Sequence, residues 1–297
     1  MRTILRLATL RIRITLRNKS FLFFSFIMPM AIFFLFGSVF AKGKAETVRY
    51  LLGPILSFTV MGTFWGLSMQ LVTWREQGIL RRFRLAPISS ASMIGSSILA
   101  NYALILPTVI LQLALSHFVY HVTEFGNLLT VFVLVIFGIT SFGAMGLVVA
   151  SVTNTMQETQ IINQILWFAL IFLTGATVPL ALLPKLVQRI GLFLPGTYFI
   201  YGLQRAVLAN AVFWKLGGVL FSLGAWALFA FLLSALLFRW EPEAKLPRNA
   251  KLWALATIFP FLLLGLWENH NGKLMNTASA MMMADQPRDS ARPANQP

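Results

Sequence analysis

Six long apolar runs dominate this chain of 297 residues. Each run holds about 20 residues or more, enough for a helix rising 1.5 Å per residue to cross a hydrocarbon layer of about 30 Å. Inside lipid every backbone polar group needs an internal partner, so the runs must fold as helices. The expected spans are Phe21–Ala41, Leu51–Thr73, Ile94–Tyr120, Leu128–Val152, Ile161–Leu183 and Leu216–Phe238. The predicted fold class is all-α, a polytopic membrane protein with a six-helix transmembrane bundle, whose internal prolines are kinks rather than helix ends: Pro29, Pro54, Pro107 and Pro179.

Composition supports a membrane protein. Residues are 58% hydrophobic and 11% charged, with a mean hydropathy of +0.76. The net charge of +15 would suit a nucleic-acid-binding protein, but the Lys and Arg residues gather in short clusters beside the apolar runs. That pattern sets membrane orientation, so we expect no nucleic-acid partner. The absence of cysteine excludes disulfides, iron–sulfur clusters and thiolate metal sites.

The distribution of basic residues favours a cytoplasmic N-terminus. With that orientation, the basic start, the loop after the second span and the segment after the sixth span all lie inside, and they hold more Lys and Arg than the outer loops. We therefore expect an integral protein of a bacterial-type inner or plasma membrane.

The two ends of the chain flank a six-span domain at residues 21–240. In residues 1–20, four arginines fall on one side of a helical wheel, as expected for an amphipathic helix in the headgroup layer: Arg2, Arg6, Arg13 and Arg17. A strand is the rival, because Arg11 to Ile14 alternates with period two, but a lone strand there has no partner. The C-terminal extension, residues 241–297, contains a short apolar segment at 252–267, which is either a seventh span or an interfacial helix. The tail from Asn269 has too little apolar content to fold alone, so we expect it to be disordered.

The energy source must lie outside this chain. No Lys, Arg, Asp or Glu falls within the expected spans away from their ends, whereas ion-driven carriers usually need intramembrane carboxylates or His. A nucleotide-binding loop is missing too, because neither Gly43-Lys44-Ala45 nor Gly272-Lys273-Leu274 continues with Ser or Thr. We expect no cofactor on this chain. His117 and His121 have the i, i+4 spacing of a metal pair but lie at a span end without an intervening Glu, so no metal site is predicted.

A basic block between the second and third spans is the clearest candidate for a protein-docking surface. It runs Arg75-Glu76-Gln77-Gly78-Ile79-Leu80-Arg81-Arg82-Phe83-Arg84-Leu85-Ala86-Pro87. Arg75 to Leu85 can form about three helical turns before Pro87. The general excess of basic residues in cytoplasmic loops explains Arg81, Arg82 and Arg84 but does not explain Glu76 and Gly78. Glu158, the only charge in the loop after the fourth span, either contacts a partner or stays solvated.

Three stretches of this sequence resemble the type 2 ABC-transporter permeases, the membrane subunits of drug-resistance and lipo-oligosaccharide exporters. The first is Arg75-Glu76-x-Gly78-x-Leu80-Arg81-Arg82-Phe83-Arg84-x-x-Pro87-Ile88-Ser89. The second is Gly146-Leu147-x-x-Ala150-Ser151, followed by Asn154, Glu158, Asn163 and Gln164. The third is Gly175-x-x-x-Pro179-Leu180-x-x-Leu183-Pro184, then Leu194-Pro195-x-Thr197-Tyr198 and Arg205. The resemblance covers about residues 1–240, and the chain beyond Arg239 departs from it.

This resemblance implies an assembly of two permeases, as a homodimer or heterodimer, and two ABC ATPase subunits that carry the ATP and Mg. The interfacial helix and the cytoplasmic loop would contact the ATPases. The docking residues would be Arg75, Glu76, Gly78, Leu80, Arg81, Arg82, Arg84, Pro87 and Glu158. Half-helices would dip into the outer leaflet between the fifth and sixth spans, a re-entrant region marked by Pro184, Pro195, Tyr198 and Arg205.

The expected function is therefore a non-enzymatic permease subunit that exports a hydrophobic or amphiphilic cargo: a drug, a natural product or a lipid-like molecule. Two alternatives come from other classes. A membrane-embedded lipid-modifying enzyme would want paired carboxylates or a His cluster near the headgroups, and this chain has only nine scattered acids. A non-transporting scaffold or immunity protein would use the same helices without a neighbouring ATPase.

Overall fold

The computed structural model describes residues 2–17, 19, 23–80, 90–237 and 259–271. Every regular element in these residues is a helix, in agreement with the predicted all-α class. The first half contains α1 (Arg2–Arg17), the π-helical η1 (Phe23–Ile27), α3 (Met28–Leu35), the π-helical η2 (Phe36–Phe40), α4 (Ala45–Met61), α5 (Thr63–Glu76) and α7 (Ser90–Tyr120). The second half contains α8 (Leu128–Val152), α9 (Met156–Leu173), η3 (Leu180–Leu182), α10 (Lys185–Gly191), α11 (Pro195–Leu208), η4 (Phe213–Leu216), α12 (Gly217–Leu236) and α14 (Phe259–Asn271).

Four helices in the described residues are long and apolar enough to cross a membrane. They cover Ala45–Glu76, Ser92–Tyr120, Leu128–Val152 and Phe213–Leu236. Each overlaps an expected span, and the expected bounds of Leu128–Val152 coincide with α8. The first expected span is helical from Phe23 to Phe40, and its apolar helix Met28–Phe40 is shorter than these four. Pro54 and Pro107 lie inside α4 and α7 without ending them, as predicted.

The fifth expected span, Ile161–Leu183, is placed differently. α9 begins at Met156 and ends at Leu173, because Thr155 caps its start and Gly175 turns the chain with a φ of +90° at its end. The sequence predicted that Pro179 would kink this span, and that prediction is wrong. Pro179 lies after α9 and precedes the short turn η3.

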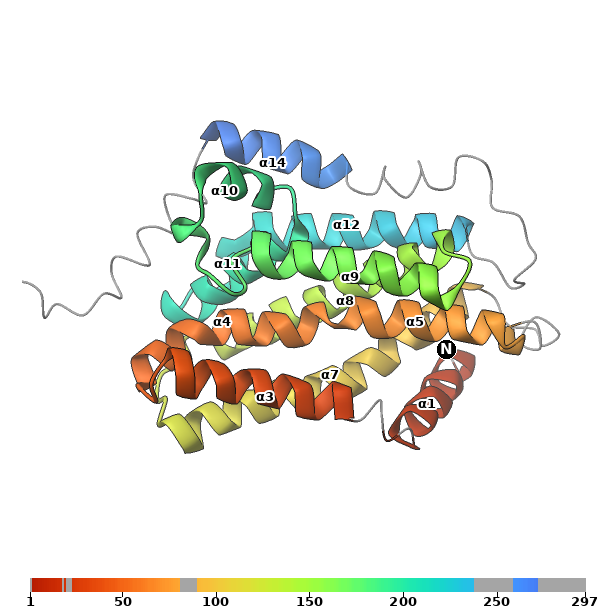
Figure 1. Cartoon of the computed structure of the whole chain (residues 1–297), viewed down its shortest axis with the longest axis horizontal. Coiled ribbons are helices and arrows are strands. Elements are labelled where there is room, and N and C mark those ends of the chain that lie inside the picture. Colours follow the sequence, from red (N-terminus) through yellow and green to blue (C-terminus); the bar gives the residue numbers. More distant parts are fainter. Residues whose placement is uncertain (1, 18, 20–22, 81–89, 238–258, 272–297) are drawn as a thin grey trace, which may run out of the picture.

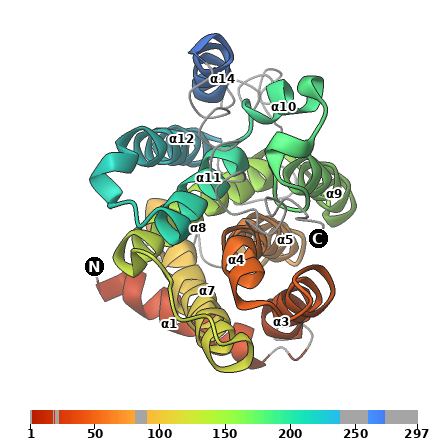
Figure 2. The ribbon, with the colours of Figure 1, turned by 90° about the vertical axis from the view of Figure 1, so that its left-hand side faces the viewer.

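The long helices pack around α8. Figure 2 shows them almost end-on, with α8 and α11 surrounded by α4, α7 and α12. α8 packs most extensively on α12 and α5, and two of its glycines allow close approach to α5 and α11. A Cβ at Gly146 would lie 2.4 Å from the Phe64 carbonyl oxygen, and one at Gly138 would lie 2.5 Å from the Phe199 ring. These glycines are therefore packing positions.

Two helices flank the bundle. α1 packs on α7 at one end and runs across the direction of the long helices in both views (Figures 1 and 2). α14 lies beside α12 and α10, and its Phe261 is buried between Tyr198 and Trp226. The apolar segment predicted at 252–267 is helical from Phe259, and the helix continues to Asn271, so the predicted unstructured tail starts too early. Residues 252–258 and those after Asn271 lie outside the described part.

Candidate coupling site at one end of the bundle

Those predicted docking residues that the structure describes gather at one end of the bundle. The helix α1, the end of α5 and the turn between α8 and α9 lie together there, opposite α10 and α11 (Figure 1). The helix formed by α4 and α5 has 32 residues, about 48 Å of rise, so it is longer than the ~30 Å hydrocarbon layer. The last turn of α5 can therefore stand outside the hydrocarbon.

Arg75, in this last turn, is buried with 3% of its surface exposed. Its Nη1 donates to the carbonyl of Ala150 at 2.9 Å, and its Nη2 donates to the carbonyl of Thr153 at 2.5 Å. The last turn of a helix leaves carbonyls without intrahelical partners and carries a negative partial charge. The guanidinium therefore caps the C-terminus of α8.

Glu76, the next residue, caps the start of α9. Its Oε1 accepts from the Met156 backbone N–H at 2.8 Å. Two further N–H groups are met locally in an arrangement similar to a capping box: Thr155 Oγ1 accepts from the Glu158 N–H at 3.1 Å, and Glu158 Oε2 accepts from the Asn154 N–H at 2.8 Å. Glu158 thus caps its own helix. Arg75 and Glu76 together tie α5 to both sides of the α8–α9 turn.

Buried polar contacts continue this link into the bundle. The hydroxyl of Thr159 donates to that of Thr153 at 2.8 Å. One helical turn deeper, Asn163 is fully buried, and its Nδ2 donates to Ser68 Oγ on α5 at 2.8 Å. Interhelical bonds of this kind stabilise membrane helix pairs by about 1 kcal/mol. They keep α9 and α5 in register.

Arg11 joins α1 to the same place. Its side chain is 3% exposed, and its guanidinium lies 4.4 Å from the centre of the Trp74 ring on α5. Within the described residues, all three guanidinium nitrogens are without a hydrogen-bond partner. Burial lowers the pKa of Arg11 to about 9, which still leaves it protonated at neutral pH. The stacked Trp74 ring is therefore the main favourable contact of a buried cation.

The docking block differs from the expected helix over Arg75–Leu85. α5 ends at Glu76 because Gly78 takes a left-handed φ of +69°. After this turn, Ile79 and Leu80 are helical again, and Leu80 is buried with 1% exposed. The other predicted docking residues, Arg81, Arg82, Arg84 and Pro87, lie outside the described residues.

The interfacial residues are partly described. Arg6, Arg13 and Arg17 are exposed on α1, while nothing is described for the Arg2 side chain.

The predicted re-entrant residues lie at the opposite end. Pro184 precedes α10, and Pro195 is the first residue of α11. Tyr198 is buried, and its hydroxyl donates to the Leu192 carbonyl at 2.9 Å. The guanidinium carbon of Arg205 lies over the Tyr201 ring, 5.9 Å from the ring centre.

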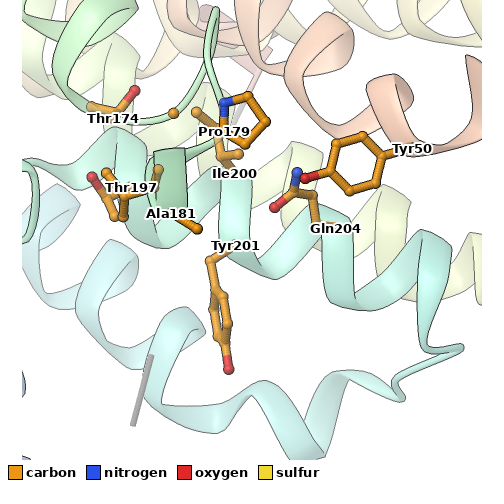
Figure 3. Close-up of a pocket in the computed structure, with 10 residues that line it drawn as sticks. Tyr50, Thr174, Pro179, Ala181, Thr197, Ile200, Tyr201 and Gln204 are labelled. Atoms are coloured by element: carbon orange, nitrogen blue, oxygen red, sulfur yellow. The ribbon is translucent and has the colours of Figure 1, made fainter. Parts of the chain in front are cut away.

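A small cavity lies in this region (Figure 3). Tyr50 and Gln204 point toward one another beside it, and Tyr201 points away. Its volume of about 20 Å³ is room for roughly one water molecule. This cavity is too small for a drug-sized cargo.

Sequence reasoning missed the internal roles of Arg11, Arg75 and Glu158. The Thr155-x-x-Glu158 spacing is a capping-box signal that could have assigned Glu158 and the start of α9. No comparable local signal marks Arg11 or Arg75 as buried, because their contacts come from helices distant in the chain.

Comparisons with known proteins link the chain to transport proteins. A family model described as "ABC-2 type transporter" matches residues 4–208. A protein of Bacillus subtilis (strain 168), named "Putative transport permease YvfS", is 28% identical over 214 residues, which cover 67% of this chain and 83% of that protein. No solved structure matches.

Proposed function

The chain belongs to the ABC-2 type transporter family, and from this premise we propose that it is the membrane subunit of an ABC exporter. Its cargo would be a hydrophobic or amphiphilic molecule, and two copies of a separate ATPase would supply the energy. ATP and Mg would bind to the ATPase chains, because this sequence contains no phosphate-binding loop.

The observation that carries the proposal is the connection made by Arg75 and Glu76. A load applied to the segment after Gly78 would act on α5 and, through these two side chains, on α8 and α9. α1 would move with them, because Arg11 stacks on Trp74. Rigid helices linked in this way suit a switch in which closure of the ATPases shifts whole elements.

In the proposed membrane arrangement, the domain at residues 21–240 has six spans, with the coupling end in the cytoplasm. The spans are the helix Phe23–Phe40, the four long apolar helices and α9. α1 would lie in the cytoplasmic headgroup layer, and α10 and α11 would form the outer re-entrant region. The larger number of basic residues at the coupling end supports this orientation.

We place the cargo route between two copies of the chain. α9 exposes an apolar stripe in which each side chain is at least half exposed: Ile161, Ile165, Phe168 and Phe172. Gln157, Gln160 and Gln164 flank this stripe and are exposed or partly exposed. Amide side chains are costly against lipid, so a second copy or a polar part of the cargo is the better neighbour.

Charge reversal in the cytoplasmic block tests the proposal. The variant Arg81→Glu/Arg82→Glu, reconstituted with the ATPase, should lose cargo-stimulated ATP hydrolysis while its membrane insertion stays normal. The matched control is Lys185→Glu/Arg189→Glu, an equal charge change on exposed residues of α10 at the other end. Full stimulation in the first variant, or equal loss in the control, would refute the docking role.

A further inference from the structure

An apolar groove runs between α1 and α7 on the outside of the bundle. Leu5, Thr9 and Ile12 line it from α1, and residues from Leu99 to Ile110 line it from α7. Its volume is about 440 Å³, and nearly all of its lining atoms are apolar. Figure 2 shows the two helices side by side at the edge of the bundle. The groove can therefore open toward lipid.

The length of the groove matches one leaflet. From Leu99 to Ile110, α7 rises about 17 Å, a little more than half of the ~30 Å hydrocarbon layer. α7 runs along the bundle, whereas α1 crosses it at one end (Figure 1). One acyl chain lying along α7 would thus have its headgroup at the level of α1.

A cationic stripe on α1 borders this groove. With 100° per residue, Arg13 and Arg6 follow Thr9 around the helix, so they flank the side that lines the groove. Both arginines and Arg17 are exposed, and no Asp or Glu occurs in α1. Within the described residues these three arginines have no carboxylate partner; the ion pair found there, Arg49–Glu124, lies elsewhere. Arg11 points the other way and is buried.

We propose that this groove binds an anionic phospholipid, with one acyl chain between α1 and α7 and its phosphate against Arg6 and Arg13. An acidic surface of a protein partner could neutralise the arginines but would leave the adjoining apolar groove empty. A phospholipid satisfies both features at once. The site requires the chain to be in a membrane but does not depend on the proposed transport function.

Native mass spectrometry of the full chain tests the site. The protein would be purified in a neutral detergent and titrated with phosphatidylglycerol or phosphatidylcholine of the same acyl composition. Each arginine beside an anionic headgroup contributes about fivefold in binding. Arg6→Gln/Arg13→Gln should therefore weaken phosphatidylglycerol binding about 25-fold and leave phosphatidylcholine binding unchanged. Arg189→Gln, on exposed α10, is the control and should change neither.

Blocking the groove tests the acyl chain. Ala103, an exposed groove residue, becomes the only thiol in Ala103→Cys, because the chain has no cysteine. The unlabelled variant should bind lipid normally, and attaching a bulky maleimide to the folded protein should abolish binding of both lipids. A labelled Leu228→Cys, in the separate groove between α8 and α12, is the control. The proposal would be overturned if the wild type bound the two lipids equally, or if neither the arginine substitutions nor the label at Ala103→Cys changed lipid binding. It would also be overturned if the arginine variant lost binding to the ATPase but kept normal binding of phosphatidylglycerol.

Discussion

At the residue scale, Arg75 is an internal helix cap at the edge of a docking segment. Arg75→Gln should lower the free energy of unfolding by about 3 kcal/mol, because hydrogen bonds from a buried charge to the α8 carbonyls are lost. Thermal unfolding in detergent, followed by circular dichroism, measures the change. Arg189→Gln removes an exposed arginine and should stay within about 0.5 kcal/mol of the wild type. An equally mild effect at Arg75 would show that the capping bonds are unimportant.

Arg11 should behave in the opposite way. Its folded pKa of about 9 lies below the ordinary value of an arginine, so below pH 9 burial of the charge opposes folding. As the pH rises above 9, the folded state loses the proton before the unfolded state does, and stability increases. Arg11→Met removes the buried charge and should match or exceed the wild type at pH 7. As the pH is raised from 8 to 10.5, the free energy of unfolding of the wild type should rise relative to that of Arg11→Met. A difference independent of pH would contradict this account.

At the scale of elements, the contact between α5 and α8 depends on Gly146. Gly146→Ala would place a Cβ 2.4 Å from the Phe64 carbonyl, so the helices must separate at a cost of about 1–3 kcal/mol. Gly217→Ala, at the start of α12, meets nothing within 4 Å and should be neutral or slightly stabilising. Chemical unfolding of both variants in the same detergent makes the comparison. Equal stability of the two would mean that α8 can move away from α5 freely.

The elements that the sequence predicted best are those with uniform apolar composition. α8 begins after Asn127, which caps it, and ends where the apolar run ends, so its bounds could be predicted. Hydropathy could not locate the start of α9, because the first turns of this helix contain the polar residues Gln157, Glu158 and Gln160. The burial of Arg11 and Arg75 depends on Trp74 and on the α8 carbonyls, contacts that exist only after the helices pack. Basic residues beside an apolar run suggest a solvated surface in either case.

At the scale of the whole molecule, α14 extends the chain beyond the region that the family model matches. Phe261 contacts Trp226, nine residues into α12, and Gly265 contacts the Phe193 ring near α10. Successive residues of α14 therefore approach the α10 end of the bundle. A single cysteine at Asn271 should react with a membrane-impermeant maleimide from the same side as one at Lys42, and from the side opposite one at Gln157. Labelling from the Gln157 side would show that α14 does not complete a seventh span.

The central claim is that this membrane subunit obtains its energy from a separate ATPase through the end that contains Arg75 and Glu76. Proteoliposomes that contain the permease, with or without the ATPase, test it most directly, with cargo movement followed under ATP, a pH gradient or a sodium gradient. We predict transport only when both chains and ATP are present. Transport by this chain alone, driven by either gradient, would contradict the claim.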